Sequence, residues 1–200
     1  LYAARLEQSG CNVSILARGQ RFSKLRAHGI LLEDTRTGKR THTQVNVVDR
    51  LAPEDVYDLV IVFMGRHQVS AVLPILAANR RTPNILFMVN NAADLDAFLG
   101  DVDRERILLG FAGAGGTREA GIVRYRILSS QQQATTLGEL DGCSSPRLDR
   151  IVSTFKRAGF PRRDKPHHGC LAQDACGLDH PCCNGSVSGW GRQLPAGANT

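Results

Sequence analysis

The chain has 200 residues, of which 42% are hydrophobic and 22% are charged, and its formal net charge is +6. This length suits one domain or one and a half, and the composition is that of an ordinary globular protein. No apolar run approaches the roughly 20 residues that span a bilayer. The basic residues are dispersed and accompany no nucleic-acid-binding motif. We therefore expect neither a membrane nor a nucleic acid as partner.

Helices and strands alternate from the start of the chain, and a helix comes first. The hydrophobic pattern predicts a helix over 1–9, a strand over 12–18, a helix over 20–27, a hairpin over 30–49 with its turn at 37–39, a strand over 57–64 and a helix over 67–80. The run over 57–64 is continuously apolar, which is typical of a parallel strand buried on both faces. Pro74 lies inside the last helix and predicts a kink or a broken first turn.

The second half continues the alternation as far as residue 160. We predict a strand over 84–90, a short helix over 94–100, a strand over 106–111, a half-exposed antiparallel strand over 121–129 paired with residues 135–140, and a helix over 145–160. Ser145 is the expected N-cap of the last helix, with Pro146 at its first position. The pattern indicates an α/β protein with a Rossmann-like, doubly wound, mostly parallel sheet that lacks its first strand.

Arg18 follows the predicted strand over 12–18 and is a candidate cofactor-binding residue. In a dinucleotide-binding fold this position faces the adenosine ribose, where an acidic residue would accept the ribose hydroxyls. An arginine suits a 2′-phosphate instead, so Arg18 favours NADP over NAD. A solvated surface arginine is the alternative.

Four segments together resemble the ketopantoate reductase family, also called 2-dehydropantoate 2-reductase. They are "LYAARLEQSGCNVSILARGQRFSKLRAHGI", "DLVIVFMGRHQVSAVLPIL", "ILFMVNNAADLDAF" and "RILLGFAGAGGTREAGIVRYRI". The resemblance covers roughly residues 1–161, the N-terminal nucleotide domain of that family. It implies reduction of a 2-keto acid, ketopantoate, to pantoate by NADPH. It also implies pantothenate biosynthesis, a cytoplasmic location and a homodimer in the intact enzyme.

The resemblance assigns further cofactor-binding residues. Arg18 matches the arginine for the 2′-phosphate, and Asn90 matches an asparagine beside both nicotinamide and substrate. Gly116 lies where the backbone approaches the cofactor. Gly65 stands where the family often has a cofactor-contacting lysine, and Arg66 is the neighbouring source of that charge. The alternatives are a strand-end cap for Asn90 and a plain flexible turn for the glycines around 116.

Residues 162–200 differ in character from the rest of the chain. They hold Cys170, Cys176, Cys182 and Cys183, whereas the preceding residues hold only Cys11 and Cys143. The spacing lacks the paired C-x2-C of structural zinc, so we expect no metal site. Disulfides would conflict with the cysteine-poor remainder.

We interpret this tail as an irregular, out-of-frame translation after Pro161. Compatible codons in the displaced frame read "DAWLKTHAA", which resembles the family's lysine helix. In this frame no catalytic residue is assigned. The chain also opens at Leu1 inside a helix, so the Gly-rich turn of the fold would lie ahead of it. We expect domain boundaries at 1–161 and 162–200, and poor folding of the chain alone.

Three functional hypotheses follow. The first is an NADPH-dependent ketopantoate reductase whose nucleotide domain is catalytically incomplete in this chain. The second is a non-catalytic nucleotide-binding remnant with a zinc-binding or interaction tail. The third is a related NADP-dependent reductase of another 2-keto acid.

Overall fold

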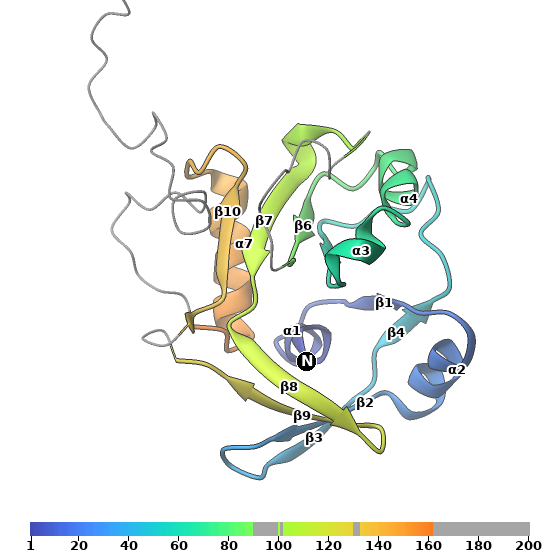
Figure 1. The fold of residues 1–200 in the computed structure, drawn as a ribbon, viewed down its shortest axis with the longest axis vertical. Coiled ribbons are helices and arrows are strands. Elements are labelled where there is room, and N and C mark those ends of the chain that lie inside the picture. The colour runs from blue at the N-terminus through green and yellow to red at the C-terminus, as the bar shows by residue number, and fades with distance from the viewer. Residues whose placement is uncertain (90–99, 101, 130–132, 162–200) are drawn as a thin grey trace, which may run out of the picture.

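The computed structural model describes residues 1–89, 100, 102–129 and 133–161 (Figure 1). Its helices are α1 (Tyr2–Gln8), α2 (Gly19–His28), α3 (Arg66–Val69), α4 (Leu73–Ala78) and α7 (Pro146–Arg157), with a 3-10 turn at Arg104–Arg106. Its strands are β1 (Ser14–Leu16), β2 (Ile30–Asp34), β3 (Arg40–Thr43), β4 (Asn46–Val48), β5 (Val60–Val62), β6 (Ile85–Phe87), β7 (Ile107–Phe111), β8 (Ala114–Glu119), β9 (Ile122–Ile127) and β10 (Thr136–Glu139). Within the described ranges no helix is both long and apolar enough to cross a membrane.

The strands form three sheets. One has the order β10-β7-β6-β5, another is the pair β1-β4, and the third has the order β3-β2-β9-β8. Strands β5, β6 and β7 are parallel, and so are β1 and β4. This arrangement confirms the predicted α/β class with a mostly parallel, Rossmann-like core.

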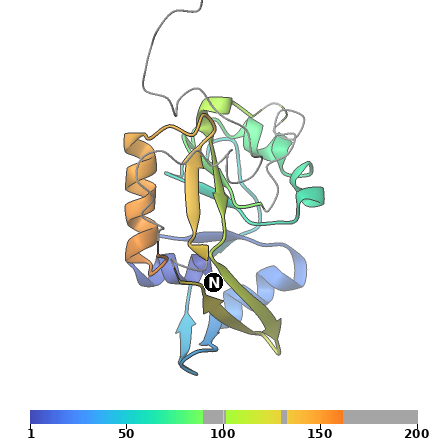
Figure 2. The same cartoon turned by 60° about the vertical axis from the view of Figure 1, so that its left-hand side comes forward.

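Strand β6 is the most deeply buried element of the fold. Ile85, Leu86 and Phe87 are all 0% exposed. Leu86 packs with residues of α1 and α7, whereas Ile85 and Phe87 pack with residues of α3 and α4. Since successive side chains of a strand point to opposite faces, helices cover both faces of this sheet. Figure 2 shows α7 on one side of the strands and the helices of residues 66–78 on the other.

A buried arginine fixes the approach to β6. Arg106 is 8% exposed, and its guanidinium donates to the carbonyl oxygens of Thr82, Leu76 and Asn79, at 2.8, 3.3 and 2.5 Å respectively. A buried guanidinium needs such acceptors because an unpaired buried charge is costly. Arg106 thus joins the start of β7 to the end of α4 and to the loop that leads into β6.

The prediction that the strand over 121–129 pairs with residues 135–140 is wrong. Strand β9 pairs antiparallel with β8 and parallel with β2, whereas β10 pairs antiparallel with β7. The alternating pattern correctly indicated a half-exposed strand, but alternation carries no information on the partner. Gly138 and Glu139 of β10 are buried against the central sheet, which a pairing with β9 would not allow.

Two other expectations need correction in detail. The hairpin over 30–49 is confirmed with a turn at Gly38 (φ +70°), but its return strand ends at Thr43 because β4 leaves to pair with β1. The run over 57–64 was expected to be buried on both faces, yet Phe63 is 42% exposed. The reason is that β5 pairs only with β6 among the described strands.

The interruption at Pro74 is confirmed. The predicted helix over 67–80 is divided into α3 and α4, and Pro74 occupies the first turn of α4. Proline is tolerated there because the first helical N–H groups have no intrahelical acceptor. The predicted helix over 94–100 lies outside the described residues except for Gly100.

Helix α7 begins as predicted. The Oγ of Ser145 accepts a hydrogen bond from the backbone N–H of Leu148 at 3.1 Å, and it donates to the carboxylate of Glu139. The cap therefore satisfies one free N–H of the first turn and ties the helix to β10.

Replacing Ser145 by alanine should lower the free energy of unfolding by about 1 kcal/mol, because the N–H of Leu148 then loses its acceptor. Urea unfolding followed by circular dichroism measures the loss. The matched control is Ser153→Ala, an exposed position within the same helix. Equal stability of the two variants would contradict the capping role.

The charge on Glu139 makes stability depend on pH. Burial alone would raise its pKa, but hydrogen bonds from Arg147 and Ser145 outweigh burial and hold the pKa below the usual value of 4.5. A carboxylate with a lowered folded-state pKa stabilises the fold above its usual value, and this contribution is lost as pH falls through the folded-state value.

Glu139→Gln should therefore destabilise the protein at neutral pH, and the difference from the unsubstituted chain should shrink as the solution is acidified below pH 4.5. Urea unfolding of both proteins over a series of acidic pH values measures this difference. If the difference in free energy of unfolding between the two proteins stays constant across the series, the charge of Glu139 is not the cause of the destabilisation.

Candidate functional site

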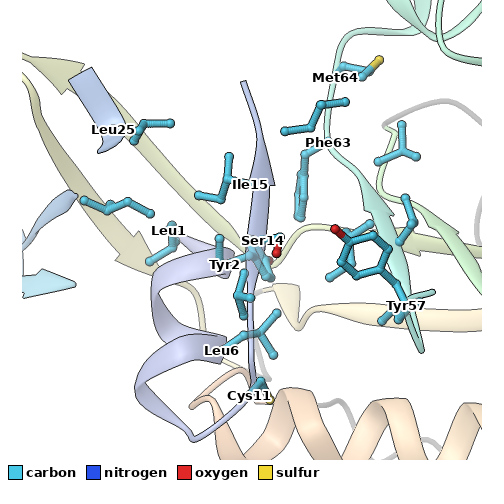
Figure 3. A pocket seen from close by; sticks show the side chains of 18 of the residues that line it. Leu1, Tyr2, Leu6, Cys11, Ser14, Ile15, Leu25, Tyr57, Phe63 and Met64 are labelled. Atoms are coloured by element: carbon cyan, nitrogen blue, oxygen red, sulfur yellow. The ribbon is translucent and has the colours of Figure 1, made fainter. Parts of the chain in front are cut away.

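A large cleft separates β1 from β5. Its volume is about 2230 Å³, and both strands line it together with residues of α1, α2 and α7 (Figure 3). The volume exceeds the roughly 300–1,000 Å³ of a typical small-molecule pocket. The predicted site residues 18 and 65 follow the two strands that border this cleft, and neither of them is among the residues that line it.

Arg18 follows β1 after one residue, Ala17, at the point where the chain turns into α2. It is the N-cap residue of α2, with extended backbone angles (φ −130°, ψ 158°). Its side chain is exposed and forms no salt bridge with the residues that the structure describes. The helix start has no side-chain cap, so its first N–H groups lack a side-chain acceptor. An uncompensated cation beside these donors fits a phosphate group.

Two cations of α2 line the cleft itself, which Arg18 does not, and they were not predicted. Arg21 and Lys24 are exposed and lie one and two helical turns after Arg18. Arg21 also acts on the α-amino group of Leu1, whose pKa is lowered first by burial and then by this neighbouring positive charge. The signal in the sequence was the spacing of three residues from Arg18 to Arg21 to Lys24, which places basic side chains along one side of a helix.

Gly65 lies at the corresponding rim of β5. It is the N-cap residue of α3, and Arg66 is the first residue of that helix. A Cβ at Gly65 would come within 2.7 Å of the imidazole ring of His67. The structure thus puts Gly65 and Arg66 at the carboxyl end of β5, where the fold class locates ligands.

The close approach of neighbouring backbone accounts for Gly113 and Gly116 of "GAGG". They were expected to form either a cofactor contact or a flexible turn, but residues 114–119 form β8. A Cβ at Gly116 would lie 2.3 Å from the carbonyl oxygen of Arg124 on β9, and one at Gly113 would lie 2.3 Å from the backbone nitrogen of Thr135. Gly115 and Gly116 therefore lie in a strand and not in a flexible turn, whereas Gly113 lies in the bend ahead of β8. The close approach of neighbouring backbone explains Gly116 without a cofactor, although Gly116 also lines the cleft.

Tyr2 closes the base of the cleft. Its ring stacks on Phe160 with centroids 4.1 Å apart and lies 4.7 Å from the ring of Phe63. Burial raises the pKa of Tyr2, and a hydrogen bond of 2.9 Å with Thr135 Oγ1 opposes the rise. The hydroxyl is thus committed to Thr135, and Tyr2 acts as a packing residue.

Asn90 lies outside the described residues, so its predicted position beside nicotinamide and substrate stays a prediction. The chain enters it from β6 through the buried residues Met88 and Val89. The cysteines of the tail also lie outside the described residues. Within the described part, Cys11 is a free thiol, and no group of three or more His, Cys, Asp or Glu side chains could hold a metal ion.

Comparison with known proteins identifies the family. The model of the family described as ketopantoate reductase PanE/ApbA matches residues 1–142. No protein among those with curated descriptions matches the chain.

Several solved structures share the fold. The 2-dehydropantoate 2-reductase from Geobacter metallireducens has a TM-score of 0.65 at 23% identity, over 81% of this chain and 52% of its own. D-mandelate dehydrogenase, solved with NADH and anilino(oxo)acetate, has 0.65 at 19%, over 88% and 56%. The PanE/ApbA family ketopantoate reductase from Ralstonia eutropha has 0.65 at 16%, over 86% and 55%.

The chain thus spans about half the length of the solved proteins that it resembles. The family model covers β1 and β5, which border the cleft, and includes the candidate residues 18, 65, 66, 90 and 116. This chain belongs to the ketopantoate reductase family.

Proposed function

We propose that the chain binds NADP(H) at the carboxyl ends of β1 and β5 and forms the nucleotide-binding part of an enzyme that reduces a 2-keto acid, ketopantoate. Family membership supports this reaction class. The same proposal places the intact enzyme in pantothenate biosynthesis in the cytoplasm, as a homodimer.

The observation that carries the choice of cofactor is the environment of Arg18. The guanidinium is exposed at the start of α2, and no acidic side chain in the described part neutralises it with a salt bridge. A planar guanidinium can donate two hydrogen bonds to one phosphate. Arg21 and Lys24 add positive charge along the same helix, which favours the 2′-phosphate of NADP over the bare ribose hydroxyls of NAD.

The other proposed residues contact different parts of the cofactor from the carboxyl ends of β1 and β5. Arg18 holds the adenosine end, while Gly65, Arg66 and Gly116 approach the remainder of the dinucleotide. Asn90 orients the nicotinamide and the keto acid by hydrogen bonds from its amide. NADPH supplies a hydride when it is bound. We assign no proton donor among the described residues.

A different 2-keto acid is the second candidate substrate. D-mandelate dehydrogenase matches this fold with a TM-score of 0.65, the same value as for the reductase from Geobacter metallireducens. Its solved form contains NADH and anilino(oxo)acetate, so the fold accepts another cofactor and another acid in that protein. The alternative of a non-catalytic remnant with a zinc-binding tail concerns residues 162–200, which lie outside the described part.

The test of the proposed cofactor uses Arg18→Ala. Adenosine 2′,5′-bisphosphate should bind about 10- to 100-fold more weakly to the variant, because a hydrogen bond to a charged group contributes about 1.5–3 kcal/mol. Binding of 5′-AMP, which has no 2′-phosphate, should change little. Isothermal titration of both ligands against both proteins measures the ratio.

The matched control is Arg36→Ala, which removes an equally exposed arginine from the turn of the β2–β3 hairpin. This control should leave both affinities unchanged. Equal losses for the two ligands with Arg18→Ala would reject the 2′-phosphate assignment. Preference for 5′-AMP in the unsubstituted chain would reject NADP itself.

A further inference from the structure

Strand β3 forms an open edge of the sheet β3-β2-β9-β8. Among the described strands it pairs only with β2, in the antiparallel sense, so one side of its backbone has no strand partner. The β2–β3 hairpin lies at one end of the described part of the molecule (Figures 1 and 2). An open strand edge presents unpaired N–H and C=O groups and is a template for a further strand. The groups that β3 presents at this edge therefore decide what can pair with it.

The register of the hairpin shows which backbone groups face the open side. The N–H of Asp34 donates to the carbonyl of Lys39 at 3.0 Å, so these two residues form a hydrogen-bonded pair. Hydrogen-bonded and non-hydrogen-bonded pairs alternate along an antiparallel ladder. Thr41, two residues after Lys39, therefore also bonds to β2, whereas the N–H and C=O groups of Arg40 and His42 point to the open side.

The side chains of β3 leave this edge accessible. Arg40 and His42 are exposed and lie on the outer face of the sheet, since Thr43 on the other face is only 7% exposed. Side chains stand roughly perpendicular to a sheet, so they do not cover its edge. Neither a proline nor a bulge interrupts β3, and both are devices that close an edge to further pairing.

Positive charge surrounds the open edge. Arg36 and Lys39 lie in the turn of the hairpin and Arg40 begins β3, and all three are exposed. The carboxylate of Glu33 pairs with Arg40 at 2.6 Å, and that of Asp34 accepts a hydrogen bond from the backbone N–H of Arg36. The side chains of Arg36 and Lys39 form no salt bridge with the residues that the structure describes. The turn thus holds two cations that an acidic partner could pair with.

These charges select one kind of occupant. A second copy of the chain would bring the same cations to the ladder, and repulsion between like charges disfavours that pairing. A nucleic acid has no strand backbone for the open N–H and C=O groups, and residues 30–43 contain no Phe, Tyr or Trp on which bases could stack. A peptide strand with carboxylates satisfies both the open backbone groups and the cations.

We propose that the open edge of β3 binds an extended acidic peptide segment of a partner protein, which adds a strand to the sheet. Main-chain hydrogen bonds to Arg40 and His42 supply affinity, and the cations of the turn, Arg36 and Lys39, supply the preference for acidic side chains. This inference does not depend on the proposed function, since no proposed cofactor residue lies in β2, β3 or the turn between them.

Peptide binding to the full chain, followed by fluorescence anisotropy, tests the proposal. The probe is a labelled Glu-Val-Glu-Val-Glu-Val peptide with blocked ends. One control peptide has every backbone nitrogen methylated, which keeps the charge but removes the N–H donors of a strand. A labelled oligothymidylate is the control polyanion. The charge variant is Arg36→Ser with Lys39→Ser, and its matched control is Arg80→Ser with Arg81→Ser, which replaces two exposed arginines after α4.

We expect the acidic peptide to bind about tenfold or more tightly than its methylated form, because only the former can complete the ladder. The charge variant should lose about tenfold in affinity for the acidic peptide, because two exposed ion pairs are lost. The control variant should bind as the unsubstituted chain does. Bound peptide should slow hydrogen–deuterium exchange about tenfold at the amides of Arg40 and His42. Exchange at Thr41 should not change, because its amide is already bonded to β2.

Equal affinity for the acidic and methylated peptides, or unchanged exchange at Arg40 and His42, would overturn the proposal. An equal loss of affinity in the charge variant and its control would overturn it in favour of general charge attraction. Oligothymidylate that binds at least as tightly as the acidic peptide and loses affinity in the charge variant would overturn it in favour of a polyanion site. Protection of the two amides in the free chain that rises with protein concentration, together with dimers in sedimentation, would overturn it in favour of a second copy.

Discussion

The structure depends on the complete burial of β6. Its three residues pair with a strand on either side and pack against helices on both faces, so neither edge nor face is open. A short apolar strand in this environment fixes which face each neighbouring helix occupies, because side chains alternate along it. Leu86 faces α1 and α7, and Phe87 faces α3 and α4. The direction of β6 in turn carries the chain toward Asn90.

Local signals in the sequence predicted the elements well where local physics decides them. Ser145 and Pro146 fixed the start of α7, and Pro74 divided a helix in two, because capping and proline sterics act within one turn. Strand partners were not predictable in this way. The run over 121–129 has a clear alternation, but its pairing with β2 and β8 depends on contacts between residues far apart in sequence.

The candidate site residues likewise fall into those that local sequence predicts and those that depend on tertiary contacts. The position of Arg18 between β1 and α2 was predictable because it is a local property of the sequence. Its contact with a 2′-phosphate stays a prediction. Gly116 was predicted from resemblance, and the close carbonyl of Arg124 that excludes a side chain there depends on tertiary structure. The spacing of Arg21 and Lys24 from Arg18 was visible in the sequence, but that they line the cleft is a property of the tertiary structure.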